Sequence, residues 1–175
     1  MKTPTRYIIS VFLSILIFVG CTAEDEAEDH AKSIENFVTG FMRGDSLLKL
    51  TVESGINYLY HPGDTTVKVK PGDTLVFDYS GYTLKDTANV FVTNMPDDAS
   101  KAKIDTVGMN FDPRKTVAGD GRLLPGLDKG LMMAHKGDSS IRIIFPPEFG
   151  FGNKSNGIVP PNSALVFCIY NLTIK

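Results

Sequence analysis

The sequence predicts an α+β fold in which short strands form a curved sheet and one short helix covers it. Two observations lead to this class. From Ser54 onward, β-branched and aromatic runs alternate with polar residues and are separated by Pro-Gly-Asp and Gly-Asp turns, a pattern typical of strands joined by tight turns. Within this region, the segment "PGLDKGLMMAHKGD" between the later strands has apolar residues at helical spacing. Strands therefore dominate, which favours the α+β class.

The strands are expected in three regions: residues 55–84, 139–146 and 163–175. In the helical segment, Leu127, Leu131 and Met132 share one face. Pro125 precedes this segment, and a Lys-Gly-Asp turn at 136–138 follows it. Because proline favours the first helical turn and glycine favours a turn after the last one, we predict a single amphipathic helix over 127–134.

The N-terminus has the pattern of an export signal. Lys2 and Arg6 precede an apolar run from residue 7 to 19, which is shorter than the ~20 residues of a membrane-spanning helix. Gly20-Cys21 follows directly and resembles the lipobox of bacterial lipoproteins, in which the cysteine is lipidated and becomes the first mature residue. The alternative is a plain secretory peptide with an incidental cysteine. We expect a signal peptide over 1–20 and lipidation of Cys21.

Charge and cysteine content narrow the function classes. The chain has 42% hydrophobic and 22% charged residues and a net charge of −2, as in an ordinary globular protein. No basic patch or arginine-rich run is present in the sequence, which disfavours nucleic-acid binding. Removal of the signal peptide leaves 16 basic against 20 acidic residues, a net charge of −4. Cys168 is then the only other cysteine, so no internal disulfide is expected.

Residues 21–53 predict an acidic tether followed by a short helix or two. Ile34, Phe37, Val38 and Phe41 have helical spacing, whereas two glycines, at 40 and 44, weaken the pattern. The acidic run after Cys21 resembles the surface-export signal of some Gram-negative lipoproteins, and the alternative is a solvated linker. The predicted organisation is a signal peptide at 1–20, this segment at 21–53 and a folded domain at 54–175.

Motifs for side-chain catalysis are absent from the sequence. His30, His61 and His135 lie far apart and lack metal-ligand spacing. Cys168 alternates with apolar residues in a predicted strand and has no base partner in the sequence pattern. We therefore expect no metal and no cofactor, and an enzyme of this sequence would act without a reactive side chain.

Three collinear motifs then resemble one family. They are "GDTLVFDYSGY", "LLPGLDKGLMMAHKGD" and "IIFPPEFGFGNKSNGIVPPNSALVFCIYNL". Their order resembles the FK506-binding-protein (FKBP) family of peptidyl-prolyl cis-trans isomerases over residues 55–175. The resemblance implies an antiparallel sheet of five or six strands wrapped around one short helix, with an apolar pocket between them. With the lipobox, the chain is similar to lipoprotein isomerases of Gram-negative bacteria, including those associated with gliding motility.

The resemblance also implies the residues of the substrate pocket. Leu123 and Leu124 match the pair before the helix, whose second backbone N–H donates to the substrate carbonyl, and Leu127 matches the pocket floor. The full set predicted from matching positions is Tyr79, Phe91, Leu123, Leu124, Leu127, Phe151, Ile158, Val159 and Phe167.

Some positions depart from the family pattern. Val92 stands where an acidic residue normally follows the pocket phenylalanine, and Phe151 replaces a loop tyrosine. The segment 92–116 is longer and more polar than in the family, and the pocket aromatic expected near Arg114 has no counterpart there. The resemblance therefore implies only weak binding of FK506-like macrolides.

The implied function is isomerisation of X–Pro bonds in exported proteins, as a folding helper in the cell envelope. Its partners would be proline-containing protein or peptide substrates, and the membrane through a lipid anchor on Cys21. The expected location is the outer membrane, facing the periplasm or the cell surface. The alternative functions are a weakly active or inactive proline-peptide binding module or chaperone, and a scaffold lipoprotein of a motility or secretion complex.

Overall fold

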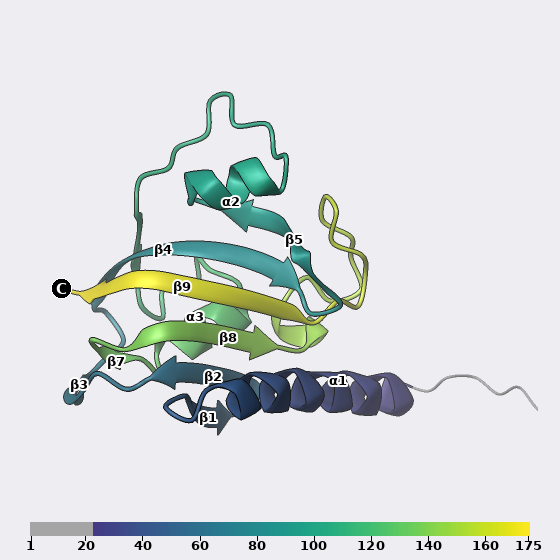
Figure 1. Cartoon of the computed structure of the whole chain (residues 1–175), viewed down its shortest axis with the longest axis horizontal. Helices are drawn as coiled ribbons and strands as arrows, with labels where there is room; N and C mark the ends of the chain where they lie inside the picture. The colour runs from purple at the N-terminus through teal and green to yellow at the C-terminus, as the bar shows by residue number, and fades with distance from the viewer. Residues whose placement is uncertain (1–22) are drawn as a thin grey trace, which may run out of the picture.

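The computed structural model describes residues 23–175 (Figure 1). The predicted signal peptide 1–20 and the lipidation site Cys21 lie outside the described residues. Within residues 23–175, no helix is both long and apolar enough to cross a membrane.

The main sheet has seven antiparallel strands, in the order β1-β2-β8-β9-β4-β5, with β6 paired to β4. The α+β prediction is confirmed. Antiparallel pairing fits strands that are joined by short turns, and it allows each face to pack against something different. The strands are β1 (Lys49–Glu53), β2 (Ile56–His61), β4 (Thr74–Thr83), β5 (Asp86–Thr93), β6 (Arg114–Val117), β8 (Ser139–Phe145) and β9 (Leu165–Ile174). A separate two-stranded sheet pairs β3 (Asp64–Lys68) with β7 (His135–Lys136).

The sheet begins earlier in the chain than the sequence predicts. Strand β1 belongs to the segment 21–53, and it pairs with β2 from Lys49 opposite Tyr60 to Glu53 opposite Ile56. Leu50 and Val52 alternate with polar residues, but this pattern is too short to predict a strand. Every residue of β1 is exposed, so no buried face marks the strand either. Pairing with β2, rather than burial of one face, holds this edge strand in place.

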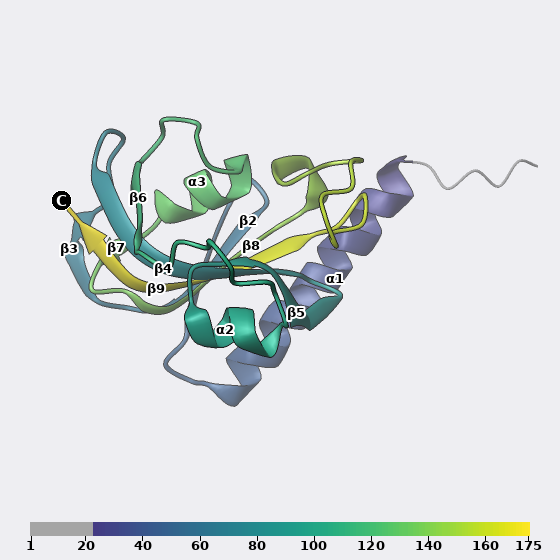
Figure 2. The ribbon, with the colours of Figure 1, turned by 90° about the horizontal axis from the view of Figure 1, so that it is seen from above.

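The short helix α3 (Pro125–Leu131) lies inside the curve of the sheet (Figure 2). It begins and ends about two or three residues earlier than predicted. Pro125 occupies the first turn, where proline lacks no needed hydrogen bond. After Leu131, Met133 and Ala134 donate to carbonyls three residues back, which tightens the chain so that β7 can start at His135.

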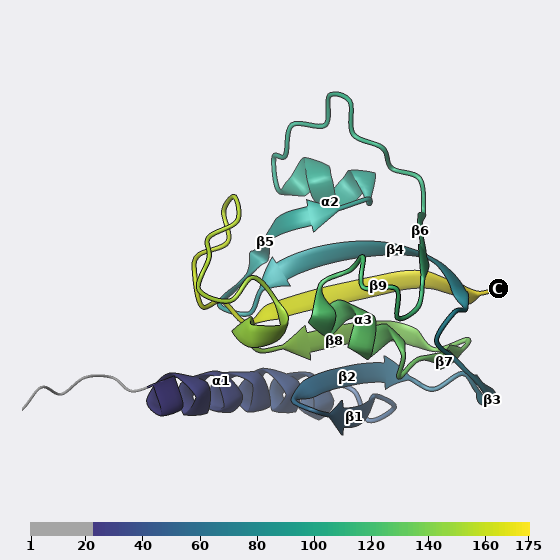
Figure 3. The ribbon, with the colours of Figure 1, turned by 180° about the vertical axis from the view of Figure 1, so that it is seen from behind.

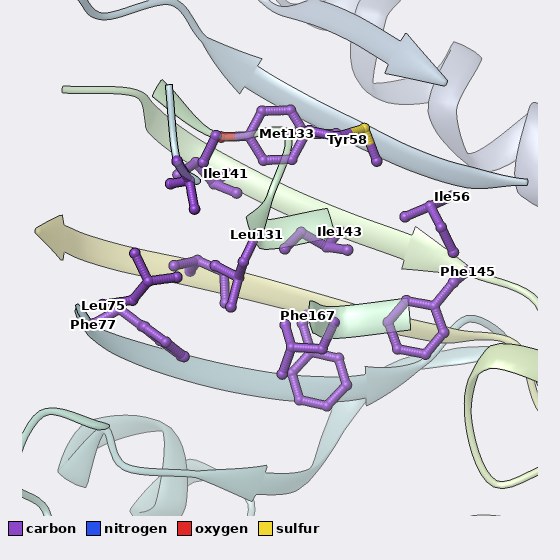
Figure 4. Close-up of a cluster of buried hydrophobic side chains, with 14 of the residues drawn as sticks. Ile56, Tyr58, Leu75, Phe77, Leu131, Met133, Ile141, Ile143, Phe145 and Phe167 are labelled. Atoms are coloured by element: carbon purple, nitrogen blue, oxygen red, sulfur yellow. The ribbon is translucent and has the colours of Figure 1, made fainter. Parts of the chain in front are cut away.

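Two glycines bring α3 unusually close to strand β8. A Cβ on Gly126 would lie 2.3 Å from Cγ of Phe145, and a Cβ on Gly130 would lie 2.2 Å from Cγ2 of Ile143. Figure 4 shows Leu131, Ile143 and Phe145 in the layer between this helix and the sheet. The large side chains of the cluster, among them Tyr58, Leu75, Phe77, Leu127, Ile141, Leu165, Phe167 and Ile169, are almost wholly buried.

Helix α1 (Ala23–Gly44) covers the opposite face of the same strands (Figures 1 and 2). It is one continuous helix of 22 residues, longer than the tether and short helix or two that the sequence predicts. Ile34 and Val38 are buried with Ile144 of β8 and Val166 of β9. The neighbours Ile143 and Phe167 belong to the cluster around α3. Because successive strand residues point to opposite faces, α1 and α3 lie on opposite sides of the sheet.

The close contact of α3 with the sheet can be tested by substituting one of its glycines. We expect Gly130→Ala to lower the free energy of unfolding by about 1–3 kcal/mol, because the added methyl group overlaps Ile143 in a packed core. Gly40→Ala in α1 is the matched control, since no atom lies within 4 Å of its Cβ position. Alanine is the better helix former, so this control should raise stability by about 1 kcal/mol.

Chemical denaturation of the two variants and the parent measures both values. Equal stability of Gly130→Ala and the parent would show that the helix can move away from the sheet without cost, against this packing arrangement.

Candidate active site

A cavity of about 590 Å³ opens between α3, the strands β4 and β5, and the loop that joins β8 to β9. Figure 3 looks onto this side of the molecule, with α3 in front of the sheet and the β8–β9 loop beside β5. The volume is within the ordinary range for a ligand site, and such sites are mostly apolar with a few polar groups. The lining residues are Phe77, Tyr79, Val90, Phe91, Val92, Ile104, Arg114, Arg122, Leu123, Leu124, Leu127, Phe151, Asn156, Gly157, Ile158 and Phe167.

Aromatic rings form the inner wall of the cavity around Phe167. Its ring stacks on Phe145 at 5.9 Å between centroids, and it meets Phe91 edge-on at 5.8 Å. Tyr79 lies 6.3 Å away on the neighbouring strand β4. Edge-on and stacked pairs of this kind stabilise aromatic clusters beyond simple burial. Phe167 is only 3% exposed, so it serves both the core and the cavity wall.

Gly81 makes room for these rings. A Cβ at this position would lie 3.0 Å from both Phe167 and Phe91 and 2.8 Å from Val92. Real Cβ atoms rarely come that close to a neighbour, so a larger residue would displace the wall. The Tyr-Ser-Gly sequence at 79–81 therefore supplies one cavity side chain, Tyr79, and the space for three others.

The residues before α3 form a second side of the cavity. Leu124 is the N-cap of α3, with φ −56° and ψ 138°, and its carbonyl accepts a hydrogen bond from Asp128 N at 3.0 Å. Its backbone N–H donates to no group among residues 23–175. Asp128 Oδ1 also accepts a hydrogen bond from Gly119 N at 2.9 Å. This carboxylate thus ties the preceding loop to the helix and holds Leu123 and Leu124 at the cavity.

The β8–β9 loop supplies the outer lip. It starts with a 3₁₀ turn, η1 (Pro147–Phe149), and then places Phe151 6.0 Å from Phe91 in an edge-on contact. Further along, Asn156 and Val159 exchange both backbone hydrogen bonds at 3.0 Å. The two residues between them form the tip of a tight turn, and Ile158 there is 67% exposed.

Val159 is the one predicted pocket residue that the structure places beneath the cavity wall rather than in its lining. Val159 is 1% exposed and packs into the core cluster beneath the lip, and it does not line the cavity. The reversal of the chain at 156–159 explains the difference, because it leaves Ile158 at the tip and carries the next residue inward. The structure brings the other predicted residues, Tyr79, Phe91, Leu123, Leu124, Leu127, Phe151, Ile158 and Phe167, together around one cavity.

Several lining residues were missed at the sequence level. Phe77 is two residues before Tyr79 on β4, so its position on the same face could have been predicted from strand periodicity. Ile104 and Arg114 lie in or after the segment between β5 and β6, which has no regular spacing from which to place them. Arg114 stands at the cavity wall in the region where the resemblance implied an aromatic side chain.

The amide of Asn94 fixes the start and the end of the 94–113 segment. Its Oδ1 accepts a hydrogen bond from Tyr79 N at 2.7 Å. Its Nδ2 donates to Asp78 Oδ1 at 3.1 Å and to the carbonyl of Asp112 at 3.0 Å. Asn94 is 5% exposed, and buried amides with all these bonds are strongly specified in orientation.

A second group of hydrogen bonds ties the short helix α2 (Pro96–Lys101) to β4. The hydroxyls of Ser80 and Thr93 lie 2.8 Å apart, and Ser80 Oγ donates to Asp98 Oδ2 at 2.6 Å. Thr93 Oγ1 also lies 2.8 Å from the carbonyl of Tyr79. Together with Asn94, these groups anchor the segment that carries Ile104 to the wall. The long polar segment is therefore an ordered part of the cavity.

Two arginines, Arg114 and Arg122, line the cavity, but none of its lining residues has a carboxylate, an imidazole or a thiol. Cys168 is adjacent to Phe167 on β9 and so points to the other face of the sheet. Burial raises the pKa of its thiol, which leaves it in the unreactive protonated form. Elsewhere, His61 pairs with Asp45 at 2.6 Å. In the part of the chain that the structure describes, no cluster of three His, Cys, Asp or Glu residues could hold a metal ion.

Comparison with known proteins decides the family. The family model described as "FKBP-type peptidyl-prolyl cis-trans isomerase" matches residues 65–170. The chain belongs to the FKBP family. The matched region contains the cavity and α3, whereas α1, β1 and β2 precede it. This family assignment agrees with the α+β fold described above. It identifies residues 65–170 as a peptidyl-prolyl isomerase domain.

The FKBP domain is similar to proteins of Emericella nidulans and Mus musculus. FK506-binding protein 1B of Emericella nidulans is 30% identical over 114 residues, which cover 63% of this chain and 88% of that protein. Peptidyl-prolyl cis-trans isomerase FKBP9 of Mus musculus is 33% identical over 109 residues, covering 62% of this chain and 16% of the mouse protein.

A solved structure extends the similarity beyond the FKBP domain. FkpA from Escherichia coli is similar with a TM-score of 0.57 and 26% identity, over 87% of this chain. This chain spans 62% of the length of FkpA. The similarity supports the curved-sheet fold and includes residues outside the 65–170 match.

Proposed function

We propose that this FKBP domain catalyses cis–trans isomerisation of X–Pro bonds in proteins exported to the cell envelope. The observation that carries this proposal is the combination of an apolar cavity with a free backbone donor at Leu124. The lining of the cavity has no carboxylate, imidazole or thiol to act as nucleophile or general base. Isomerisation needs neither, because it breaks no covalent bond.

The barrier to isomerisation explains why such a cavity is sufficient. Rotation about the C–N bond of an amide costs about 18–20 kcal/mol, because the planar form is stabilised by resonance. The planar amide has the larger charge separation, so an apolar environment favours the twisted amide relative to water. A prolyl ring held against Phe167 and Leu127 would place the X–Pro amide in this environment. Catalysis then follows from binding the twisted state more tightly than either planar state.

The Leu124 N–H would orient the substrate chain. A carbonyl next to the reacting bond can accept this hydrogen bond, whose donor is otherwise unpaired among the described residues. The loop tip at Ile158 and the ring of Phe151 would close over the apolar side of the bound segment. This arrangement would bind the proline ring and the adjacent backbone. The side chains on either side of the proline would then lie at the rim of the cavity.

Weak macrolide binding is part of this proposal. Val92 lines the cavity where an acidic group was expected, and Phe151 has no hydroxyl. Each lost hydrogen bond corresponds to about 0.5–1.5 kcal/mol, or a factor of about two to ten in affinity. A rigid ligand that depends on these polar groups would lose more than a peptide bound through its proline ring.

The decisive test measures isomerisation of a short X–Pro peptide by residues 22–175, with two variants of one residue. Leu124→Ala removes the side chain but keeps the backbone N–H, whereas Leu124→Pro removes the N–H as well. The φ of −56° at this position is compatible with proline. We expect kcat/KM of Leu124→Pro to fall about two- to tenfold below that of Leu124→Ala, the range for one hydrogen bond.

A rate with the parent protein no faster than in buffer, from a folded sample, would overturn the isomerase proposal. Binding of the same peptide without acceleration would instead indicate a proline-peptide binding module. Equal kcat/KM for the two Leu124 variants would remove the backbone donor from the mechanism.

We also propose that Cys21 carries the lipid anchor and places the domain at the envelope. The proposal is supported by the positive start, the short apolar run and the Gly-Cys pair of the sequence. Cys21→Ser should move the protein from the membrane fraction to the soluble fraction of the cell that makes it. Cys168→Ser, which removes a cysteine within the folded domain, should leave it in the membrane fraction. Sedimentation of Cys21→Ser with membranes would argue against the anchor.

A further inference from the structure

Arg114 presents an unpaired cation at the wall of the apolar cavity. It is the first residue of β6 and lies opposite Phe77 of β4, with both residues lining the cavity. Its side chain is exposed. Among residues 23–175, its guanidinium has no hydrogen bond, ion pair or aromatic ring contact. An arginine left without a partner beside aromatic side chains is free to bind a group of the ligand.

Arg122 adds a second cation at the same cavity. It precedes Leu123 and Leu124, and its side chain is 80% exposed. Its Nε lies 3.4 Å from Asp120 Oδ2, so part of its charge is already balanced. Arg114 lacks such a neighbour and is therefore the stronger candidate for ligand binding.

The cavity wall thus combines two guanidinium groups with no carboxylate. Val92 of β5, which pairs with the other end of β4, adds an apolar side chain to the same wall. Walls of low dielectric concentrate the field of unpaired charges at the opening of a cleft. Both charged side chains of the lining are therefore positive, although the whole chain has a net charge of −2.

We infer that the cavity selects proline segments in which a glutamate or aspartate flanks the proline, and that Arg114 is the main residue recognising the carboxylate. This inference rests on the proposed isomerase function. The planar guanidinium can donate two parallel hydrogen bonds to a carboxylate. Because Arg114 is exposed, the pair should contribute about as much as a surface ion pair, up to roughly 1 kcal/mol or a factor of about five.

The test compares peptides that differ only in charge. One pair places Glu or Gln directly before the proline, in Ala-Xaa-Pro-Phe, and the other places Glu or Gln directly after it, in Ala-Leu-Pro-Xaa. The kcat/KM of each is measured by NMR exchange, without a coupling protease. We expect the Glu peptide of at least one pair to exceed its Gln counterpart by roughly two- to fivefold at low salt. The ratio should approach one at high salt, because salt screens exposed charges.

Two variants with the same change in charge assign the effect. Arg114→Gln should bring the Glu/Gln ratio to about one. Lys115→Gln is the matched control, because the next residue of the strand points away from the cavity and does not line it. This control should keep the ratio of the parent. Thermal unfolding of both variants checks that neither change disturbs the fold.

The outcomes separate the inference from the proposed function. Glu/Gln ratios of one in the parent for both pairs, with measurable turnover, would overturn the inference and leave the isomerase proposal standing. A ratio kept in Arg114→Gln but lost in Arg122→Gln would overturn the role of Arg114. If no peptide is accelerated, the isomerase proposal fails, and equal binding of the Glu and Gln peptides to the same protein would then overturn charge selection as well.

Discussion

The close contact between α3 and strand β8 is the constraint on which the cavity depends. Gly126 and Gly130 lie directly over Phe145 and Ile143, and a methyl group at either glycine would overlap these side chains. The helix starts at Pro125, so its position also sets that of Leu124 and its free N–H. Phe145 in turn stacks on Phe167 at the inner wall. One contact between a helix and a strand thus fixes both the backbone donor and the aromatic wall.

The two faces of the sheet pack against different helices. The concave face holds α3 and the cavity, whereas α1 covers the opposite face through Ile34 and Val38. The segment 94–113 is fixed to β4 through Asn94 and brings Ile104 to the wall. The cavity is therefore built from elements whose positions depend on packing and buried hydrogen bonds, as a site that acts by shape and polarity requires.

Local pattern was sufficient to predict strands β2, β3, β4, β8 and β9 and the short helix, because these follow from strand periodicity and turn residues. Most of the cavity residues were implied by the resemblance of the motif order to the FKBP family. Other features depend on contacts that sequence spacing does not encode. Val159 turns inward because of a backbone bridge to Asn156. The single long helix α1 results from packing on Ile144 and Val166. Arg114 reached the wall through the pairing of β6 with β4, after a segment without regular periodicity.

The central claim is that the cavity acts through polarity and shape, without a group that gains or loses a proton. The most direct measurement is kcat/KM for an uncharged X–Pro peptide from about pH 5.5 to 8.5, within the range where histidine and perturbed carboxylates titrate. The structure predicts a flat profile, because no carboxylate, imidazole or thiol lines the cavity and arginine keeps its charge throughout. A bell-shaped or stepped profile of tenfold or more, from protein that stays folded over this range, would contradict it.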